Sequence, residues 1–236
     1  MVVEDGTEAA IDGFTRSACV FAAVAFQQAQ PRPVRLAHLL HAPAHLIAAA
    51  ERSVPCLVTI REPEAAVASC VIREPYLTPA VTLDAWTRFY ERLLPYRDRM
   101  VVGEFSRVTS DLGSLIVEMN ERFGSSFAPF VHTPDNVERV FAFIEERAAR
   151  PAYEAHIGRY MSGLETAAEL DAARRTAAGR GKDSLVPFEH RVARPSAERR
   201  ELHAAVTERI RAPALASRRA RAARVYSAFV GGAPPR

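Results

Sequence analysis

Short apolar runs alternate along the first half of the chain with longer stretches of helical length. The apolar runs predict strands over Ala9–Asp12, Val34–Leu40, Pro55–Ile60 and Met100–Phe105. Pro55–Ile60 is almost continuously apolar, which is typical of a strand buried on both faces of a parallel sheet. The sequence therefore predicts a buried parallel sheet.

The stretches between the strands predict helices. The first is expected to begin after Ser17 and to end before Pro31. The next two are expected over Pro43 to about Arg52 and over Pro63 to Ile72. A fourth is capped by Thr82 or Asp84 and runs to about Leu94, and a fifth runs from Thr109 to Phe123, before Gly124. Beyond residue 134 the pattern is helical alone, over 136–150, 167–182 (a helix or a loop), 196–211 and 214–229. Alternating strands and helices favour right-handed βαβ units with helices on both faces of the sheet.

We therefore expect one α/β domain over residues 1–236. Its core, over about 9–130, is predicted to be a three-layer P-loop NTPase-like fold with a central parallel sheet. The residues from about 134 to 230 are predicted to form a helical C-terminal cap.

Composition agrees with a soluble globular protein, because 48% of the 236 residues are hydrophobic and 25% are charged. The net charge of +3 is too small to indicate nucleic acid. Lys182 is the only lysine among the 31 basic residues. An anion site in this chain would therefore use arginine, whose forked guanidinium suits phosphate and sulfate oxygens.

The cysteines and the first residues of the chain indicate the cellular compartment. Cys19, Cys56 and Cys70 lack metal-binding spacing and are odd in number, which favours free thiols in a reducing compartment. The first residues lack a basic n-region, and the apolar run after Ser17 is too short to span a bilayer. We expect a cytoplasmic protein without a membrane span.

The stretch from Asp12 to Val20 predicts a strand, a tight loop and the start of a helix. Such a loop directs backbone N–H groups and a helix N-terminus toward one point, which favours anions. Arg16 adds a positive charge and Ser17 adds a hydroxyl. The pattern G-x-x-x-x-G-K-[ST] is not met, so an ordinary turn without a ligand is the alternative.

A second segment, Leu57 to Ser69, adds to this prediction. Arg61 follows a buried strand, at the edge where open α/β sheets bind ligands. Ser69 lies seven residues after Glu62, nearly two helical turns, on the same face as the start of the helix. Arg61 and Ser69 could hold one phosphate together. Alternatively, Arg61 pairs with a carboxylate and Ser69 is an ordinary helix residue.

Together these segments resemble the sulfotransferases that use 3′-phosphoadenosine 5′-phosphosulfate (PAPS). In that family the pattern G-[FY]-P-[RK]-S-G-[TN]-[TSF] holds the 5′-phosphosulfate, and R-[DE]-P followed by a serine holds the 3′-phosphate. Similar residues here are Gly13 to Ser17, Ile60 to Pro63 with Ser69, Phe89-Tyr90, Val101 to Phe105 with Thr109, and Asn120 to Phe127. The resemblance covers about residues 9–130.

The resemblance implies a PAPS site and a sulfuryl transfer that needs no metal, with adenosine 3′,5′-bisphosphate as the product. The implied donor-binding residues are Gly13, Phe14, Thr15, Arg16, Ser17, Ala18, Cys19, Arg61, Ser69 and Arg194. Four loop positions depart from the family pattern. Thr15 replaces proline, Ala18 replaces glycine, and Cys19-Val20 replaces a small or hydroxylic pair, which weakens the expected donor site.

His41 is the candidate general base, because Leu40 to Pro43 resembles the family's H-x-P context and an imidazole can take a hydroxyl proton at neutral pH. His38 is the weaker candidate, since strand alternation points it away from His41. A surface or hydrogen-bonded histidine is the alternative for each. Metal binding by His38, His41 and His45 is disfavoured, because Pro43 interrupts a continuous helix.

Basic residues near the C-terminus have two interpretations. The family often folds a late basic segment over the 3′-phosphate, which makes Arg194 the candidate, with Arg199 behind it. The favoured alternative is a solvated helix start with Ser196 as N-cap. The run Arg218 to Arg221 has few aromatic neighbours, so nucleic-acid binding is set aside.

We expect a transferase that moves a sulfuryl group from PAPS to a hydroxyl on a small molecule or glycan, with Arg16 and His41 as catalytic residues. The alternatives are a non-catalytic sulfotransferase-like binding protein and, less favoured, a P-loop kinase. The acceptor and the oligomeric state are left open, with a homodimer as one candidate.

Overall fold

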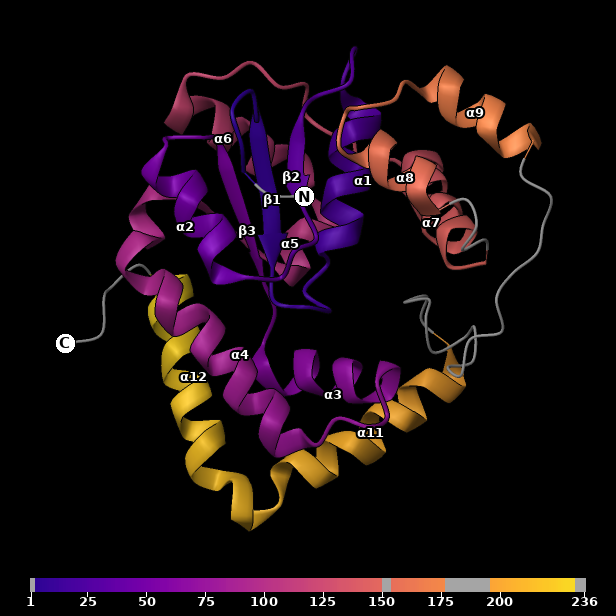
Figure 1. Cartoon of the computed structure of the whole chain (residues 1–236). Helices are drawn as coiled ribbons and strands as arrows, with labels where there is room; N and C mark the ends of the chain where they lie inside the picture. Colours follow the sequence, from indigo (N-terminus) through magenta and orange to yellow (C-terminus); the bar gives the residue numbers. More distant parts are fainter. Residues whose placement is uncertain (1–2, 150–153, 177–195, 232–236) are drawn as a thin grey trace.

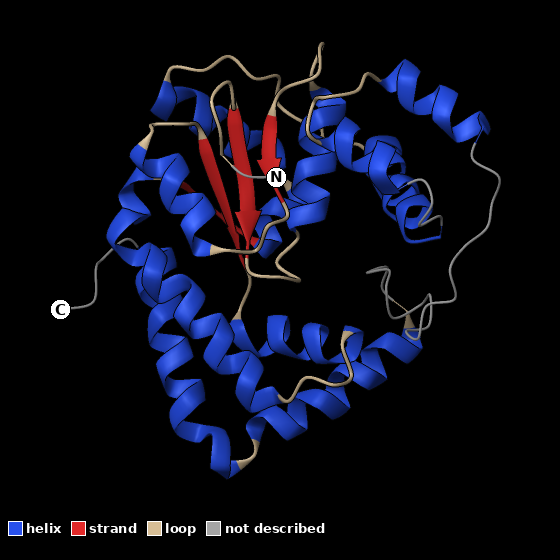
Figure 2. Cartoon of the chain, viewed as in Figure 1, coloured by secondary structure: helices blue, strands red, loops and turns tan. Residues whose placement is uncertain are grey.

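The centre of the molecule is a parallel sheet of four strands in the order β2-β1-β3-β4 (Figure 2). The computed structural model describes residues 3–149, 154–176 and 196–231. The strands are β1 (Ala9–Gly13), β2 (Leu36–His38), β3 (Cys56–Ile60) and β4 (Val101–Glu104). The predicted α/β class and central parallel sheet are therefore confirmed.

Helices cover both faces of this sheet (Figure 1). In the first half of the chain they are α1 (Cys19–Ala29), α2 (Pro43–Glu51), α3 (Pro63–Arg73), α4 (Pro79–Leu93), α5 (Phe105–Ser110) and α6 (Leu112–Phe123). The C-terminal helices are α7 (Pro134–Ala149), α8 (Glu154–Met161), α9 (Ala167–Thr176), α11 (Ala197–Arg211) and α12 (Ala216–Gly231). None of the helices in the described ranges is long and apolar enough to cross a membrane.

Strand alternation divides the buried side chains between two apolar cores. Ala10 and Val58 face a core shared with α2, α3, α4, α11 and α12. Ile11 and Leu57, their chain neighbours, face a second core shared with α1, α6, α7, α8 and α9. The sheet is thus the middle of three layers.

β1 and β3 are neighbours in the sheet, yet the helices that follow them lie on opposite faces. This divergence opens a crevice beyond the carboxyl ends of the two strands, the place where open parallel sheets bind ligands. The strands approach closely there, because a Cβ on Gly13 would lie 2.1 Å from the carbonyl oxygen of Thr59. Glycine is therefore required at the end of β1.

Two predicted boundaries near the site are wrong. β2 is shorter than the predicted strand Val34–Leu40, because Leu39 (φ 55°) and His41 (φ 51°) have left-handed backbone that cannot continue a strand. His41 therefore lies in the loop after β2, and strand alternation does not relate it to His38. The cap of α4 is Thr78, whose hydroxyl accepts a hydrogen bond from the N–H of Val81, and not Thr82 or Asp84.

Two predictions further along the chain also need correction. The helix predicted over Thr109–Phe123 is two helices, because Asp111 (φ −154°) interrupts it and caps α6 through the N–H of Ser114. Helix α8 was not predicted, since the chain after Pro151 has no clear start signal. Arg194 and the end of the predicted stretch 167–182 lie outside the described residues.

Candidate functional site

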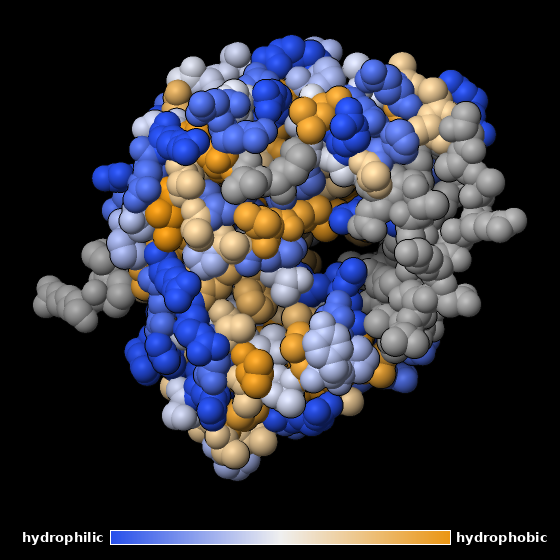
Figure 3. Space-filling model, viewed as in Figure 1, coloured by the Kyte–Doolittle hydropathy of each residue, from blue (hydrophilic) through white to orange (hydrophobic). Residues whose placement is uncertain are grey.

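A cavity of about 960 Å³ lies beyond the carboxyl ends of β1 and β3, between the loop before α1 and helices α3 and α11. Figure 3 shows the surface hollowed between the sheet half of the molecule and these two helices. The basic residues on its walls are Arg16, Arg61, Arg73, Arg147, Arg199 and Arg200. Among the described lining residues Glu74 is the only acidic one, and it pairs with Arg73 at 3.4 Å. The cavity is therefore suited to an anion.

The loop before α1 makes a sharp turn, and the N-terminus of α1 borders this cavity. Arg16 and Ala18 both have left-handed backbone (φ 68°), which turns the chain sharply into the helix. No side chain caps α1, although Ala18, Cys19 and Val20 line the cavity. The uncapped helix N-terminus therefore offers donors and a positive dipole end to an anion.

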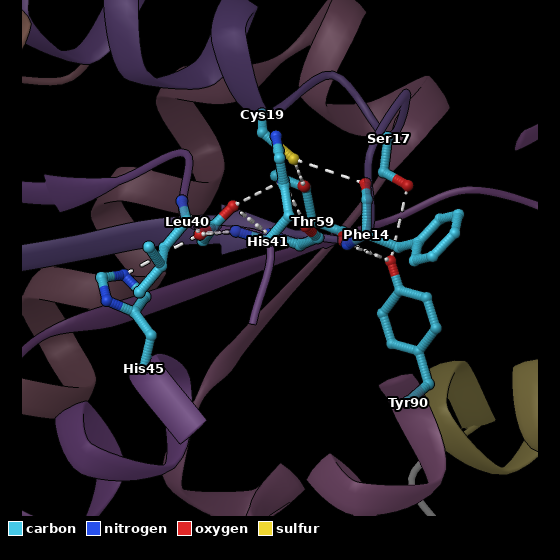
Figure 4. A network of polar contacts seen from close by, with 10 residues as sticks. Phe14, Ser17, Cys19, Leu40, His41, His45, Thr59 and Tyr90 are labelled. Atoms are coloured by element: carbon cyan, nitrogen blue, oxygen red, sulfur yellow. Dashed lines mark hydrogen bonds and ion pairs between the residues drawn. The ribbon is translucent and has the colours of Figure 1, made fainter. Parts of the chain in front are cut away.

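Tyr90 holds this loop against the sheet from α4. Its hydroxyl donates to the carbonyl of Thr59 (2.8 Å) and accepts the N–H of Phe14 (3.2 Å). With its hydrogen used, it accepts from the hydroxyl of Ser17 at 3.4 Å (Figure 4). Ser17 is fully buried in this arrangement, so its side chain supports the loop and does not reach the cavity.

Ser69 lies between two guanidinium groups. Arg16 donates from Nε to Ser69 Oγ at 3.1 Å, and Arg199 donates from Nη2 to the same oxygen at 3.4 Å. Both donors occupy lone pairs of Oγ, so the hydroxyl hydrogen is left for a further acceptor, and Ser69 lines the cavity. Three chain segments far apart in sequence thus converge on one point: the loop, α3 and α11.

Arg61 enters the same group from the end of β3. Its guanidinium carbon lies 4.1 Å from the ring centre of Phe105, a cation–π contact that fixes the side chain. Its Nη1 donates to the carbonyl of Arg16 at 3.4 Å. Arg61 is therefore held beside the loop before any ligand arrives.

Like charges accumulate here at an energetic cost. Burial, together with the nearby charges of Arg73, Arg199 and Arg61, lowers the pKa of Arg16 to about 9. Burial and the charge of Arg199 also lower the pKa of Arg61. Because a guanidinium remains protonated in proteins, these shifts report the cost of burying the charges and, after it, their mutual repulsion, which a bound anion would relieve.

On the side of the loop near β2, the buried Asp12 pairs with His41, whose side chain is one-third exposed. His41 Nδ1 lies 3.1 Å from Asp12 Oδ1 and 2.9 Å from the carbonyl of Gly13. Asp12 Oδ2 accepts the backbone N–H groups of Leu40 and His41. Despite burial, hydrogen bonds and charge from Asp12 and Cys19 raise the pKa of His41 to about 11, so the ring is cationic at neutral pH.

The other two histidines of the sequence cluster face elsewhere. His38 Nε2 hydrogen-bonds Ser162 Oγ at 3.1 Å, and burial lowers the pKa of His38 to about 3. His45 is buried in α2 with Nε2 3.9 Å from Asp12 Oδ2, and burial lowers its pKa. Neither residue lines the cavity, so His41 is the histidine of this cluster that a ligand can reach.

The structure separates the sequence-predicted residues into two groups. Those that line the cavity are Thr15, Arg16, Ala18, Cys19, His41, Arg61 and Ser69. Gly13, Phe14 and Ser17 do not line it: Gly13 packs on Thr59, and Phe14 packs edge-on against Phe89. These three residues shape the loop from behind.

Sequence reasoning missed several cavity residues. Arg199 was the second candidate behind Arg194, with a solvated helix start as the favoured alternative, and Ser196 does cap α11 by accepting the N–H of Arg199. Yet the guanidinium of Arg199 reaches Ser69. Arg73 had a readable signal, because it lies four residues after Ser69 on the same helix face. His203 carried none.

Comparisons of the sequence with family models, with curated proteins and with solved structures give no match. The candidate site therefore stands on its own geometry: a helix N-terminus and clustered arginines around one buried serine hydroxyl.

Proposed function

We propose that this protein is a sulfotransferase with a P-loop-like core, which moves a sulfuryl group from PAPS to a hydroxyl acceptor. The observation that carries the proposal is the Ser69 hydroxyl between Arg16 and Arg199, with Arg61 beside it. A donor with a phosphosulfate and a separate 3′-phosphate carries negative charge at two places. The cavity likewise offers positive charge at two places, the α1 N-terminus and the arginines around Ser69.

In this proposal the 3′-phosphate lies against Arg61, Ser69 and Arg199, and the phosphosulfate lies against the α1 N-terminus and Arg16. Such fixed donors stabilise charge that develops on the oxygen bridging phosphate and sulfur. The acceptor oxygen forms a bond to sulfur while the bond from sulfur to the bridging oxygen breaks. Adenosine 3′,5′-bisphosphate then leaves.

His41 is proposed to take the acceptor's proton. Asp12 makes its neutral form a strong base, but the raised pKa of His41 makes that form scarce at pH 7. The proton transfer should therefore be favoured by alkaline conditions. The apolar part of the cavity wall, which includes Phe21, Phe141 and Ile144, is proposed to receive the acceptor.

Calorimetric titration with adenosine 3′,5′-bisphosphate tests the donor site. We expect micromolar binding to the unmodified protein, and at least about tenfold weaker binding to Arg61→Ala, because a hydrogen bond to a charged group contributes about 1.5–3 kcal/mol. Arg221→Ala is the matched control, since Arg221 pairs with Glu91 outside the cavity lining. It should bind as the unmodified protein does.

Other results would favour the alternatives. Equal or tighter binding of ATP would contradict a 3′-phosphate site and favour a kinase. Failure of every nucleotide to bind, with folding intact, would favour a non-catalytic protein. An equal loss in Arg61→Ala and Arg221→Ala would mean that charge alone, and not this site, attracts the nucleotide.

A further inference from the structure

Cys19, His41 and Asp12 form a cluster that the sulfuryl-transfer proposal leaves partly unused. A carboxylate oxygen, the Cys19 sulfur and a ring nitrogen of His41 all lie within 4.8 Å of one another. Figure 4 shows the His41 ring beside the Cys19 thiol, with α1 and the loop after β2 supplying one residue each. A thiol, an imidazole and a carboxylate in this order are the components of an activated nucleophile.

Hydrogen bonds settle which imidazole nitrogen carries the fixed proton. His41 Nδ1 lies 2.9 Å from the carbonyl oxygen of Gly13, and a carbonyl can only accept. Nδ1 is therefore the donor, shared with Asp12 Oδ1 at 3.1 Å. Nε2 is therefore the nitrogen that can take up or release a proton, and the ring lies within 4.8 Å of the Cys19 sulfur.

Three neighbouring features can stabilise negative charge that develops on the Cys19 sulfur when it attacks. Cys19 is the first residue of α1, at the positive end of the helix dipole. The Thr59 hydroxyl lies 3.1 Å from its sulfur and can donate to it. The third feature is the His41 imidazole, whose positive form is stabilised by Asp12 Oδ1 at 3.1 Å from Nδ1. When Cys19 is protonated, its thiol donates to the Phe14 carbonyl at 3.6 Å, which is a long and weak hydrogen bond.

We propose that Cys19 is a reactive thiol at the floor of the anion cavity, activated by His41 and Asp12, and that small hydroperoxides oxidise it there. Cys19 is a lining residue of the cavity, so a small reagent that enters the cavity reaches this residue. Cys56 and Cys70 are buried as well, but burial raises the pKa of both thiols, that of Cys70 to about 11. They should react slowly.

The step balances with hydrogen peroxide as the oxidant. The Cys19 sulfur attacks one peroxide oxygen, so that an S–O bond forms while the O–O bond breaks. The departing hydroxide takes a proton from His41 and leaves as water. Sulfur loses two electrons and becomes sulfenic acid, while the peroxide is reduced.

A bound metal explains the cluster less well. The two oxygens of Asp12 already accept hydrogen bonds from three backbone N–H groups and from His41. A cation would have to replace some of these bonds. It would also require a neutral His41 ring.

The test treats EDTA-washed protein at pH 7 with hydrogen peroxide, traps sulfenic acid with dimedone and measures each cysteine peptide by mass spectrometry. Cys56 and Cys70 serve as internal references. We expect Cys19 to be trapped at least about tenfold faster than either. His41→Asn should reduce that rate about tenfold. Asparagine tolerates the left-handed backbone at position 41, and circular dichroism verifies the fold.

Three results would overturn the proposal. One is that Cys19 reacts no faster than Cys70. A second is that folded His41→Asn reacts as fast as the unmodified protein, which would mean that access alone sets the rate. The third is that one equivalent of Zn²⁺ binds tightly and blocks the reaction, which would assign the cluster to a metal. The outcome does not depend on nucleotide binding, which the calorimetric titration measures separately.

Discussion

At the scale of single residues, Ala18 combines a side chain with a backbone that suits glycine. Its left-handed conformation (φ 68°, ψ 17°) costs an alanine about 1–2 kcal/mol. The structure retains it because this turn places the α1 N-terminus at the cavity. The loop before α1 is therefore under local strain at the point that the proposed donor would contact.

Ala18→Gly should relieve that strain. After allowing for the greater flexibility of glycine in the unfolded chain, we expect the free energy of unfolding to rise by about 0.5–1 kcal/mol. Urea denaturation measures the change. Ala22→Gly is the matched control: Ala22 lies within α1, where loss of the methyl group should lower stability by about 1 kcal/mol.

The same variant separates an enzyme from a binding scaffold. A working donor site should gain affinity for adenosine 3′,5′-bisphosphate when the Ala18 methyl group is removed from the cavity wall.

The stability measurement has its own contrary outcome. A lower free energy of unfolding in Ala18→Gly would show that the left-handed conformation is not strained in solution.

The Asp12–His41 pair should make stability depend on pH. His41 has a folded-state pKa of about 11, above the roughly 6.5 of a free imidazole. Its contribution is therefore complete below about pH 6.5 and declines as the pH rises toward 11. The free energy of unfolding should fall between pH 6.5 and 7.5, below the range in which most exposed thiols ionise.

Urea denaturation at a series of pH values checks this decline, and folded His41→Asn should show a flatter dependence. The contribution of Asp12 to the free energy of unfolding changes with pH in the opposite direction. Its pKa is lowered by His41 and by backbone N–H groups, although burial opposes them, so its contribution is lost only in acid. A wild-type profile that rises with pH over this window would contradict the assigned pair.

At the scale of elements, the site is assembled from helix ends and loops that repel one another. The loop before α1, the end of β3 and helices α3 and α11 each bring an arginine to the cavity, and the charge of Arg16 is destabilised by three others. Removing one charge should therefore stabilise the empty protein while harming ligand binding.

Arg16→Gln tests this trade-off. We expect the free energy of unfolding to rise by roughly 1 kcal/mol without ligand, after allowing for solvent screening and for the lost bond to Ser69. Affinity for the bisphosphate should fall at least about tenfold. Arg221→Gln, outside the cavity lining, should change stability by less than about 0.5 kcal/mol.

Added sodium chloride should reduce the gain in Arg16→Gln, because salt screens the repulsion that the substitution removes. Destabilisation of the empty protein by Arg16→Gln would show that the Ser69 bond outweighs the charge. Thermal unfolding with and without the bisphosphate measures both effects.

The elements that the sequence predicts well are those whose signals are local. The apolar run before Arg61 and the proline at the start of α3 place this arginine correctly at a strand end. The interruption at Asp111 and the contact of Arg199 with Ser69 were not predictable in the same way. The first depends on how α5 and α6 pack, and the second joins residues 130 positions apart.

The candidate site shows the same division. The predicted strand and the helix that follows it place Arg61 at the strand's carboxyl end and Ser69 on that helix, so both are expected near the same edge of the sheet. The sequence pattern does not show that Ser17 points toward Tyr90, because that contact depends on a helix 73 residues away. It also gives no sign of the His41 backbone, whose left-handed turn brings the ring to Asp12 and Cys19.

At the scale of the whole molecule, α1 and α3 belong to different apolar cores and meet across the cavity. Each layer is secured to the sheet by its own hydrophobic contacts, whereas across the cavity the arginines repel. A ligand with two anionic ends would therefore bind both layers and join them across the cavity. The fluctuations of the two layers would then become correlated, and their relative motion would be larger in the empty protein than in the ligand-bound one.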